Sequence, residues 1–378
     1  MSIARLLTVA LVAAGPAFPL PARAGTLTLL CSFKGGSDGR NPYGGLIYEN
    51  GTLYGTTQAG GTFGRGTVFS IDPTLGNKVV LYSFKETPDG AVPYDGVIYE
   101  SAALYGTTNA GGASNLGTVF VINLQTGVET VLHSFAGGND GENPYGGLVY
   151  DGGWVYGTTF AGGSSGAGTV FKVHVETGQE VVLASFTVDN GDGPYGGLAG
   201  KGAYLYGTTT AGGSSSKGTV FKVSRKTGAV SVLYNFAGGA SGNYPYAGLL
   251  LQHGALYGTT VQGDDTGYGN VFKINVASGA ETVLHSFQAG TDAEYPFAGL
   301  TYHSGAFYGA TDNGGTSNNG ALFKVNHKTG AETVIYSFAG GAGGANPWGT
   351  LIYEGGFYYG TTEAGGSSGD GTVFKFAP

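Results

Sequence analysis

The chain has 378 residues, of which 75 are glycine and only 11% are charged, and its formal net charge at pH 7 is −8. The acidic balance argues against a nucleic-acid partner, which calls for a basic surface, and against attachment to anionic membranes. The 41% apolar and 13% aromatic residues argue against the disorder that so much glycine would otherwise suggest.

The first 24 residues have the pattern of a secretory signal peptide. Arg5 gives a positive start, Leu6 to Ala14 form an apolar stretch, and Ala22-Arg23-Ala24 form a cleavage site. The apolar stretch is far shorter than the roughly 18–20 residues of a membrane-spanning helix. We therefore expect cleavage after Ala24, a secreted or periplasmic protein, and no membrane insertion after cleavage.

The next segment, Thr26 to Phe33, has the pattern of a strand with no partner beside it in the sequence. It contains the single cysteine, Cys31, so no internal disulfide can form in the mature chain. The equivalent positions of later repeats hold Tyr, His or Ala. We therefore expect Cys31 to be chemically inert.

From Pro42 to Phe84 the chain predicts four strands in succession. Asn50-Gly51 is a strong hairpin signal between the first two strands, and a glycine-rich loop joins the second to the third. Adjacent apolar residues, as in Val170-Phe171 of a later repeat, indicate strands that are buried on both faces. The predicted strands are Gly45–Glu49, Thr52–Thr57, Gly66–Ile71 and Val79–Phe84.

The rest of the chain repeats this unit with a period of 50 or 51 residues, which indicates a blade-by-blade architecture. Its marker is the sequence Tyr-Gly-Thr-Thr, nearly unchanged, starting at Tyr54, Tyr105, Tyr156, Tyr206, Tyr257, Tyr308 and Tyr359. The chain begins with a lone fourth strand and its last unit lacks one. An open array would need polar capping repeats, whereas a ring lets the N-terminal strand complete the last unit. Residues 25–378 therefore predict an all-β, seven-bladed β-propeller with four antiparallel strands per blade.

The motifs Leu-Tyr-Gly-Thr-Thr, Gly-Thr-Val-Phe, Ser-Phe and Pro-Tyr-Gly-Gly-Leu recur in this order over nearly all of residues 27–376. This pattern resembles the GloVer-type tandem repeat family of exported bacterial proteins. The resemblance implies a secreted or surface repeat protein with no assigned reaction. Relatives often carry a C-terminal sorting or anchoring segment, whereas this chain stops at Phe376-Ala377-Pro378 after a strand. We therefore expect a soluble exported protein, and a monomer.

In a propeller, the loops from fourth to first strands and from second to third strands emerge on one face around the central funnel. These loops are long, glycine-rich and variable here, so we expect any binding site on this top face. An aromatic residue follows proline at the entry to each first strand. It either packs as a wedge between blades, the interpretation we favour, or forms a ring for stacking on sugars. These candidates are Tyr43, Tyr94, Tyr145, Tyr195, Tyr246, Phe297 and Trp348.

Acidic residues are scattered through the same loops. The segment Asp189–Gly193 faintly resembles a calcium loop, but no segment has the full EF-hand spacing, and carboxylates that cap their own turns are the favoured alternative. Asp264 and Asp265 are ligand candidates because their loop departs from the repeat. We expect no cofactor and no metal, with Ca²⁺ as the open alternative. The acids are Asp38, Asp89, Asp140, Asp189, Asp192, Asp264, Asp265, Asp292, Glu294 and Asp370.

No catalytic residue is predicted. None of the histidines, at 133, 174, 253, 285, 303 and 327, falls in a predicted top-face loop, which argues against a His-based triad or zinc site there. Paired funnel acids suit glycoside hydrolysis. A tyrosine base with Arg40 or Arg65 beside a substrate carboxylate suits a lyase.

Three functions remain open. The first is a binding or interaction scaffold for a polysaccharide or a cell-surface partner, with Phe297 and Trp348 as the favoured contacts. The second is a polysaccharide-active lyase or hydrolase with its site in the funnel. The third is a purely structural envelope protein.

Overall fold

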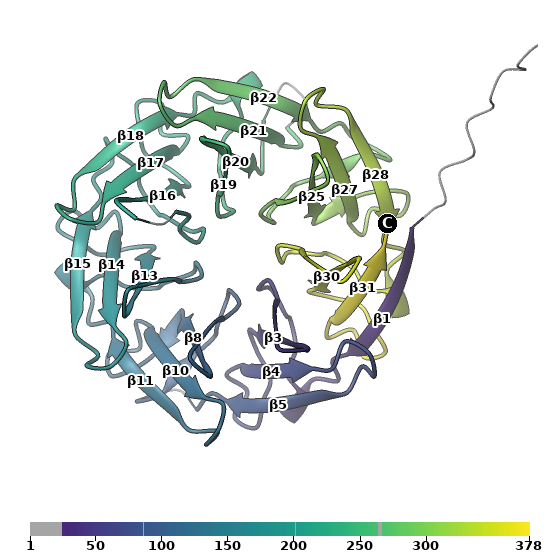
Figure 1. The fold of residues 1–378 in the computed structure, drawn as a ribbon, viewed down its shortest axis with the longest axis horizontal. Helices are drawn as coiled ribbons and strands as arrows, with labels where there is room; N and C mark the ends of the chain where they lie inside the picture. Colours follow the sequence, from purple (N-terminus) through teal and green to yellow (C-terminus); the bar gives the residue numbers. More distant parts are fainter. Residues whose placement is uncertain (1–24, 86, 201, 264–266) are drawn as a thin grey trace, which may run out of the picture.

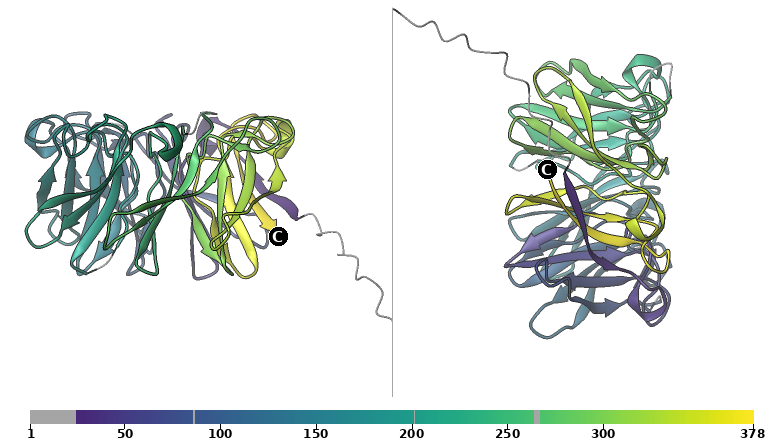
Figure 2. Two further views of the ribbon diagram at one scale, coloured as in Figure 1. Left: turned by 90° about the horizontal axis from the view of Figure 1, so that it is seen from above. Right: turned by 90° about the vertical axis from the view of Figure 1, so that its right-hand side faces the viewer.

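A computed structural model describes residues 25–378 apart from 86, 201 and 264–266. Seven antiparallel sheets stand around a central axis as the blades of a propeller (Figure 1). Seen from the side, the ring is a short, thick disc (Figure 2). The predicted all-β propeller with seven blades is therefore confirmed. The expected signal peptide lies outside the described residues.

Each blade runs from an innermost first strand to an outermost fourth strand. The first strands are three residues long because the segments before them converge on the axis. In the fourth blade this strand is reduced to a bridge between Ala199 and Tyr206. The first strands are β2 (Ile47–Glu49), β7 (Ile98–Glu100), β12 (Val149–Asp151), β19 (Leu250–Gln252), β24 (Thr301–His303) and β29 (Ile352–Glu354).

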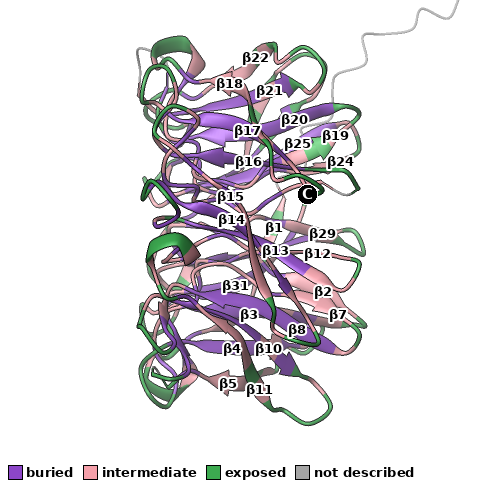
Figure 3. Cartoon of the chain, turned by 90° about the vertical axis from the view of Figure 1, so that its left-hand side faces the viewer, coloured by how far each residue is buried: buried purple, intermediate pink, exposed green. Residues whose placement is uncertain are grey.

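The second and third strands form the middle of each blade. The second strands carry the Tyr-Gly-Thr-Thr marker and are β3 (Thr52–Thr57), β8 (Ala103–Thr108), β13 (Trp154–Thr159), β16 (Tyr204–Thr209), β20 (Ala255–Thr260), β25 (Ala306–Thr311) and β30 (Phe357–Thr362). The third strands are β4 (Thr67–Ile71), β10 (Thr118–Asn123), β14 (Thr169–His174), β17 (Thr219–Ser224), β21 (Asn270–Asn275), β27 (Ala321–Asn326) and β31 (Thr372–Ala377). Figure 3 shows that burial is concentrated in these two strands, while the connecting turns are exposed.

The fourth strands form the outer wall of the ring. They are β5 (Lys78–Ser83), β11 (Glu129–Ser134), β15 (Glu180–Ser185), β18 (Val230–Asn235), β22 (Glu281–Ser286), β28 (Glu332–Ser337) and β1 (Thr26–Ser32). The last of these belongs to the seventh blade, whose strand order is β1-β31-β30-β29. Thr26 pairs with Ala377 and Ser32 with Thr372, so the N-terminal strand closes the ring as predicted.

The boundaries found in the first repeat are close to those expected. The second strand coincides with the prediction, and the others differ by one or two residues. The hairpin turn forms because Asn50 and Gly51 both take positive φ, 50° and 83°, which a tight turn between twisted strands requires.

Neighbouring blades are held together by phenylalanine pairs. The phenylalanine that directly follows each fourth strand is fully buried and packs edge-on against the phenylalanine of the next blade's third strand. Phe33 meets Phe69 at a ring-centroid distance of 5.1 Å, and Phe338 meets Phe374 at 5.4 Å. The same contact recurs at the other five interfaces. Replacing one of these phenylalanines with alanine would lower the free energy of unfolding by about 3–5 kcal/mol.

The Tyr-Gly-Thr-Thr marker is explained by packing. A Cβ on Gly55 would lie 2.7 Å from both the Leu46 and the Phe69 side chains, so only glycine fits beneath that ring. The Thr56 hydroxyl donates across the blade interface to the Asp95 carbonyl at 2.8 Å. The Thr57 hydroxyl stays within the blade and donates to the Ala59 carbonyl at 3.0 Å. The marker therefore has a structural role.

The loops predicted to share the top face do so, because each fourth-to-first loop pairs with the second-to-third loop of the blade that it enters. Arg40 bridges to Ala59 in this way, and Glu142 to Ala161. In two blades the pairing forms short strands, β6 (Gly90–Ala91) with β9 (Ala110–Gly111) and β23 (Ala293–Glu294) with β26 (Asn313–Gly314). Four of these loops also contain a 3-10 turn: η1 (Gly36–Asp38), η2 (Gly138–Asp140), η3 (Gly239–Ser241) and η4 (Gly341–Gly343). Within the described residues, no helix has the length and apolar character needed to cross a membrane.

Candidate functional site

A ring of seven aromatic side chains surrounds the top of the central channel. All seven line one cavity of about 70 Å³, and each of them is partly exposed to it. The members of this aromatic ring are Tyr43, Tyr94, Tyr145, Tyr195, Tyr246, Phe297 and Trp348.

Every member of the aromatic ring also packs against its two neighbours. The ring-centroid distances run from 4.1 Å for Phe297 and Trp348, which stack in parallel, to 5.7 Å for Tyr43 and Tyr94. These separations lie within the range in which aromatic pairs attract one another. The side chains therefore face the funnel and also pack from blade to blade, and their use for stacking on sugars stays a prediction.

The backbone before each aromatic residue aims it at the axis. The residue that precedes the proline has a positive φ in all seven blades, and in Val92, a β-branched residue, this conformation (φ 61°) is strained. The proline is buried and fixes the next turn of the chain. The seven residues are Asn41, Val92, Asn143, Gly193, Tyr244, Tyr295 and Asn346.

Below the aromatic ring the channel narrows to a waist of glycines, because the first-strand segments of adjacent blades touch backbone to backbone. A Cβ on Gly196 would lie 2.5 Å from the backbone of Ala247. Two positions of the waist carry polar side chains instead, Asp95 and Thr350. A second cavity of about 380 Å³, largely lined by leucines, lies beyond the waist and shares both residues with the upper one.

Asp95 places a carboxylate in the waist of the channel. It accepts hydrogen bonds from the backbone amides of Gly96 and Gly147, both at 2.7 Å. Burial raises the pKa of Asp95 above its usual range, and these amide bonds offset only part of the rise. The Thr350 hydroxyl accepts a bond from the Gly299 amide at 3.0 Å. The two polar side chains of the waist therefore already have protein partners.

Two further acids stand behind the aromatic ring on one side. The Trp348 Nε1–H donates to Asp312 at 2.8 Å, and the Tyr43 hydroxyl donates to Glu363 at 2.5 Å. Burial raises the pKa of both carboxyls; the charge of Asp312 adds to the rise at Glu363, and the bonds from the aromatic side chains oppose it. On another side of the funnel, Phe160 occupies the position equivalent to Asp312 and Glu363. It packs edge-on against Tyr145 at a ring-centroid distance of 5.4 Å. The funnel thus has an acidic side and an apolar side.

The sequence analysis did not select Asp95, Asp312 or Glu363. Each was visible as a break in the repeat. Asp95 replaces the first glycine after the aromatic residue, and the other two occupy the position that follows the Tyr-Gly-Thr-Thr marker. That position is the most variable one near the funnel: Gln58, Asn109, Phe160, Thr210, Val261, Asp312 and Glu363.

The remaining candidates lie elsewhere. Asp264 and Asp265 fall outside the described residues. Several loop acids cap their own turns at the outer edge of the ring, as expected. Asp38 accepts from the Lys34 amide at 2.9 Å, and Asp292 accepts from the Gln288 amide at 2.8 Å. None of these acids lines the funnel.

The comparisons with solved structures agree with the fold. The extracellular domain of a one-component system from B. thetaiotaomicron aligns with a TM-score of 0.60 at 10% identity, over 90% of this chain and 39% of that one. The oligogalacturonate lyase of Vibrio parahaemolyticus aligns with a TM-score of 0.57 at 12% identity, over 93% of each chain. A chain of the mitotic checkpoint complex aligns with a TM-score of 0.59 at 13% identity, over 98% of each. At these identities the likeness concerns the fold alone.

No curated protein sequence matches this chain. The profile of the Gloeobacter/Verrucomicrobia repeat matches it three times, over residues 12–199, 138–305 and 288–378. These matches together cover the whole propeller, as the resemblance noted from the sequence implies. The chain therefore belongs to the Gloeobacter/Verrucomicrobia repeat family.

Proposed function

We propose that this protein is an exported propeller that binds a neutral polysaccharide, free or on a cell surface, across the mouth of its funnel. The observation that carries this proposal is the unbroken ring of seven aromatic side chains around one cavity. Flat aromatic faces with polar groups at their edges suit the alternating apolar faces and hydroxyls of sugar rings.

The size and charge of the funnel limit the kind of ligand that can bind there. A cavity of about 70 Å³ is far smaller than the roughly 300–1,000 Å³ of pockets that enclose a small-molecule ligand. A sugar would therefore lie across the aromatic ring and not below it. None of the described residues that line the cavity is basic, while Asp312 and Glu363 stand behind the ring. These charges favour a neutral glycan over a polyuronate.

Calorimetric titration with a neutral glucan, a neutral mannan and a polyuronate tests the proposal. We expect binding of a neutral polymer and at least a tenfold loss in the Trp348→Ala variant, which corresponds to about 1.4 kcal/mol. Trp348→Phe keeps a ring against Phe297 but removes the indole N–H, so an intermediate loss is expected.

The matched control is Phe63→Ala, which removes an aromatic side chain that is 51% exposed in a top-face loop outside the cavity. Its affinity should equal that of the unaltered protein. If no neutral polymer binds, or if Phe63→Ala weakens binding as much as Trp348→Ala, the proposal is wrong.

A glycoside hydrolase is the second candidate, favoured by the two raised carboxyl pKa values of Asp312 and Glu363 beside the aromatic ring. A lyase with a tyrosine base fits less well, because burial and the neighbouring Glu363 raise the pKa of Tyr43, which disfavours its deprotonation. New reducing ends from a neutral glycan, abolished by Glu363→Gln, would establish hydrolysis. Their absence with every polymer that binds would remove this candidate.

Export is supported by Arg5, the apolar stretch after it and the Ala22-Arg23-Ala24 sequence. Mass spectrometry of the protein from its native host should find a mature chain that starts at Gly25. A cell-associated protein that retains Met1 would contradict this part of the proposal.

A further inference from the structure

The outer edge of the ring contains a second feature that is built seven times and does not belong to the funnel. Between each pair of adjacent blades, three equivalent positions define what we call a rim junction. The first lies near the end of a fourth strand, the second in the top-face loop that follows, and the third at the start of the next blade's fourth strand. The seven rim junctions are Cys31/Asp38/Lys78, Tyr82/Asp89/Glu129, His133/Asp140/Glu180, Ala184/Asn190/Val230, Tyr234/Ser241/Glu281, His285/Asp292/Glu332 and Tyr336/Gly343/Leu27.

At the five other junctions the charges are balanced, absent, or accompanied by a tyrosine hydroxyl that donates to a carboxylate. Lys78 places its ammonium 2.6 Å from the Asp38 carboxylate. The Tyr82 hydroxyl donates to Asp89 at 2.8 Å, and the Tyr234 hydroxyl donates to Glu281 at 2.6 Å. Other junctions are apolar, as where Leu27 packs into the cluster that contains Tyr336. Packing between the blades therefore does not require histidine or a pair of acids.

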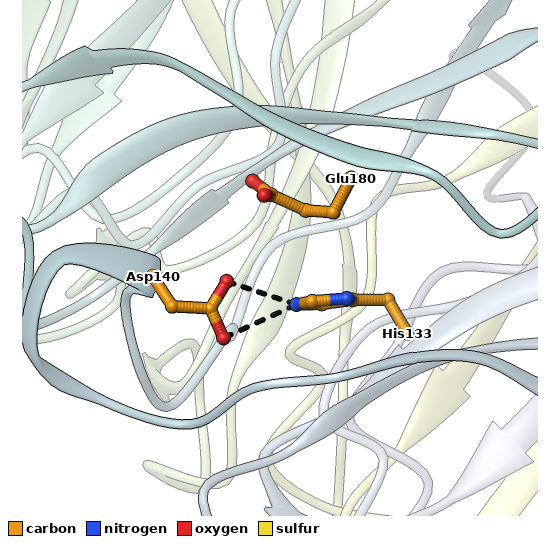
Figure 4. A group of neighbouring side chains, drawn as sticks. All are labelled: His133, Asp140 and Glu180. Atoms are coloured by element: carbon orange, nitrogen blue, oxygen red, sulfur yellow. Dashed lines mark hydrogen bonds and ion pairs between the residues drawn. The ribbon is translucent and has the colours of Figure 1, made fainter.

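Two rim junctions combine one imidazole with two carboxylates. In the first, His133 Nε2 lies 3.0 and 3.2 Å from the two Asp140 oxygens, and the Glu180 carboxyl lies beside this contact (Figure 4). In the second, His285 Nε2 lies 3.6 Å from Asp292, with Glu332 in the third position. In both, one nitrogen and two carboxylate oxygens lie within 4.8 Å of one another.

At each of these two junctions, the glutamate in the third position has a carboxylate oxygen without a hydrogen-bond partner. Among the described residues, the buried Oε1 atoms of Glu180 and Glu332 have no hydrogen-bond partner, and neither does Nε2 of His285. The same oxygen is unpartnered in Glu129 and Glu281, but there a tyrosine hydroxyl donates to another carboxylate oxygen of the junction. At the histidine junctions the imidazole stands in place of that hydroxyl: His133 Nε2 contacts Asp140, while His285 Nε2 lies too far from Asp292 for a hydrogen bond. A buried polar atom without a partner is costly and calls for an unseen one.

The loop acid is fixed before any ion arrives. Asp140 accepts from the Ala136 amide at 2.6 Å, and Asp292 is held by its own loop amides. The histidine and aspartate side chains are 17–20% exposed, so that an ion can enter from solvent.

We propose that the two histidine rim junctions each bind one divalent transition-metal ion through His133, Asp140 and Glu180 and through His285, Asp292 and Glu332. The imidazole nitrogen favours Zn²⁺ over the hard cations Ca²⁺ and Mg²⁺, which prefer oxygen ligands alone. Zinc bonds of about 2.0–2.2 Å hold tetrahedral ligand atoms about 3.4 Å apart, which is close to the observed histidine–aspartate distances of 3.0 and 3.6 Å. Water fills the fourth position. These sites are independent of the glycan proposal.

Calorimetric titration of the full-length protein with ZnCl₂ at neutral pH tests the proposal. We expect two equivalents of zinc to bind. His133→Tyr should lose one equivalent, and the double variant with His285→Tyr should lose both. Tyrosine is the matched replacement because Tyr82 and Tyr234 occupy the same position in other blades, so the variants should fold and melt like the metal-free parent.

The chain also offers a gain-of-function test. Tyr82→His places an imidazole beside Asp89 and Glu129, which reproduces the histidine junction at a third interface. This variant should bind three equivalents of zinc, while Ca²⁺ at the same concentration should displace none of them. The proposal is overturned if the parent binds no zinc, if both equivalents persist in the double tyrosine variant, or if Ca²⁺ competes equally.

Discussion

The funnel and the rim junctions stand on the same face of the ring and are both built seven times, but they differ in how much variation they accept. At the waist, first-strand segments touch backbone to backbone, and glycine or alanine fills nearly every position. At the rim the blades have spread apart, and the space between outer strands accepts lysine, tyrosine, histidine, valine or leucine. Positions that hold nearly the same residue in all seven blades are therefore those where the backbones are crowded. Positions that vary between blades are those where one blade can carry a side chain with a different function.

The largest expected effect comes from removing the strand that completes the ring. Deleting residues 25–33 takes away the whole β1–β31 pairing and the buried Phe33 ring. Loss of one buried phenylalanine alone costs about 3–5 kcal/mol, a large part of the stability of a typical domain. We expect loss of the cooperative thermal transition by circular dichroism. Thr28→Ala, an exposed change in the same strand, should melt normally. A deletion variant that melts like the parent would contradict ring closure.

A smaller effect is expected where the crowded interior meets an added methyl group. A Cβ on Gly157 would lie 2.6 Å from the Phe171 ring, so Gly157→Ala should cost about 1–3 kcal/mol in the free energy of unfolding. The control is Gly343→Ala at the rim, where nothing lies within 4 Å of an added Cβ. Urea unfolding of both variants measures the contrast. Equal stability of the two would show that the interior is less crowded than the contacts indicate.

The rim should respond to pH through Glu129, which is not a member of either histidine junction. Burial, followed by the charge of Asp89, raises its pKa to about 7, while Tyr82 and Lys85 oppose the rise. The folded state then binds more protons than the unfolded state between about pH 4.5 and 7, so this group stabilises the fold at acid pH and that stability is lost as pH rises. Glu129→Gln should flatten this part of the stability profile, measured with a chelator present. An unchanged or steeper profile would contradict the assignment.

The smallest effect concerns Cys31, which should have no chemistry of its own. Burial raises its pKa to about 11, although Lys78 opposes the rise. Alkylation by iodoacetamide at pH 8 should be about 100-fold slower than for a free thiol, because the thiolate is the reactive form. Denaturation should restore the ordinary rate. Rapid labelling of the folded protein would show that this rim junction is open.

The fold could be predicted from the sequence because each repeat carries its own strand and turn signals and the unit recurs seven times. The pattern Asn50-Gly51 defined a hairpin, and the lone strand at Thr26 implied closure. The short first strands could not be placed as well. Their ends depend on the approach of neighbouring backbones, as at Gly45 and Gly96, which no local pattern describes.

The candidate site could be predicted only in part. The seven aromatic residues were found because they recur, but their mutual packing depends on the distance of each blade from the axis. Asp312 and Glu363 were missed because each changes a single residue of its repeat, whereas the loop of Asp264 and Asp265 departs from the repeat over several residues. The histidine rim junctions were missed for another reason. His133 lies in a strand and Asp140 in a loop, and they meet Glu180 of the next blade only once the ring is assembled.

The pairing of β1 with β31 has a consequence for how the chain folds during synthesis. During synthesis β1 is made first, while β31, to which it must bind, is made last. Every other third strand meets its fourth strand through a short turn, and a short loop closes at a far lower entropic cost than the whole chain. We therefore expect those local hairpins to form first and to occupy six of the seven near-identical edges. The N-terminal strand would then pair with the one third strand that is still free, so that a chain with seven similar edges folds in one register.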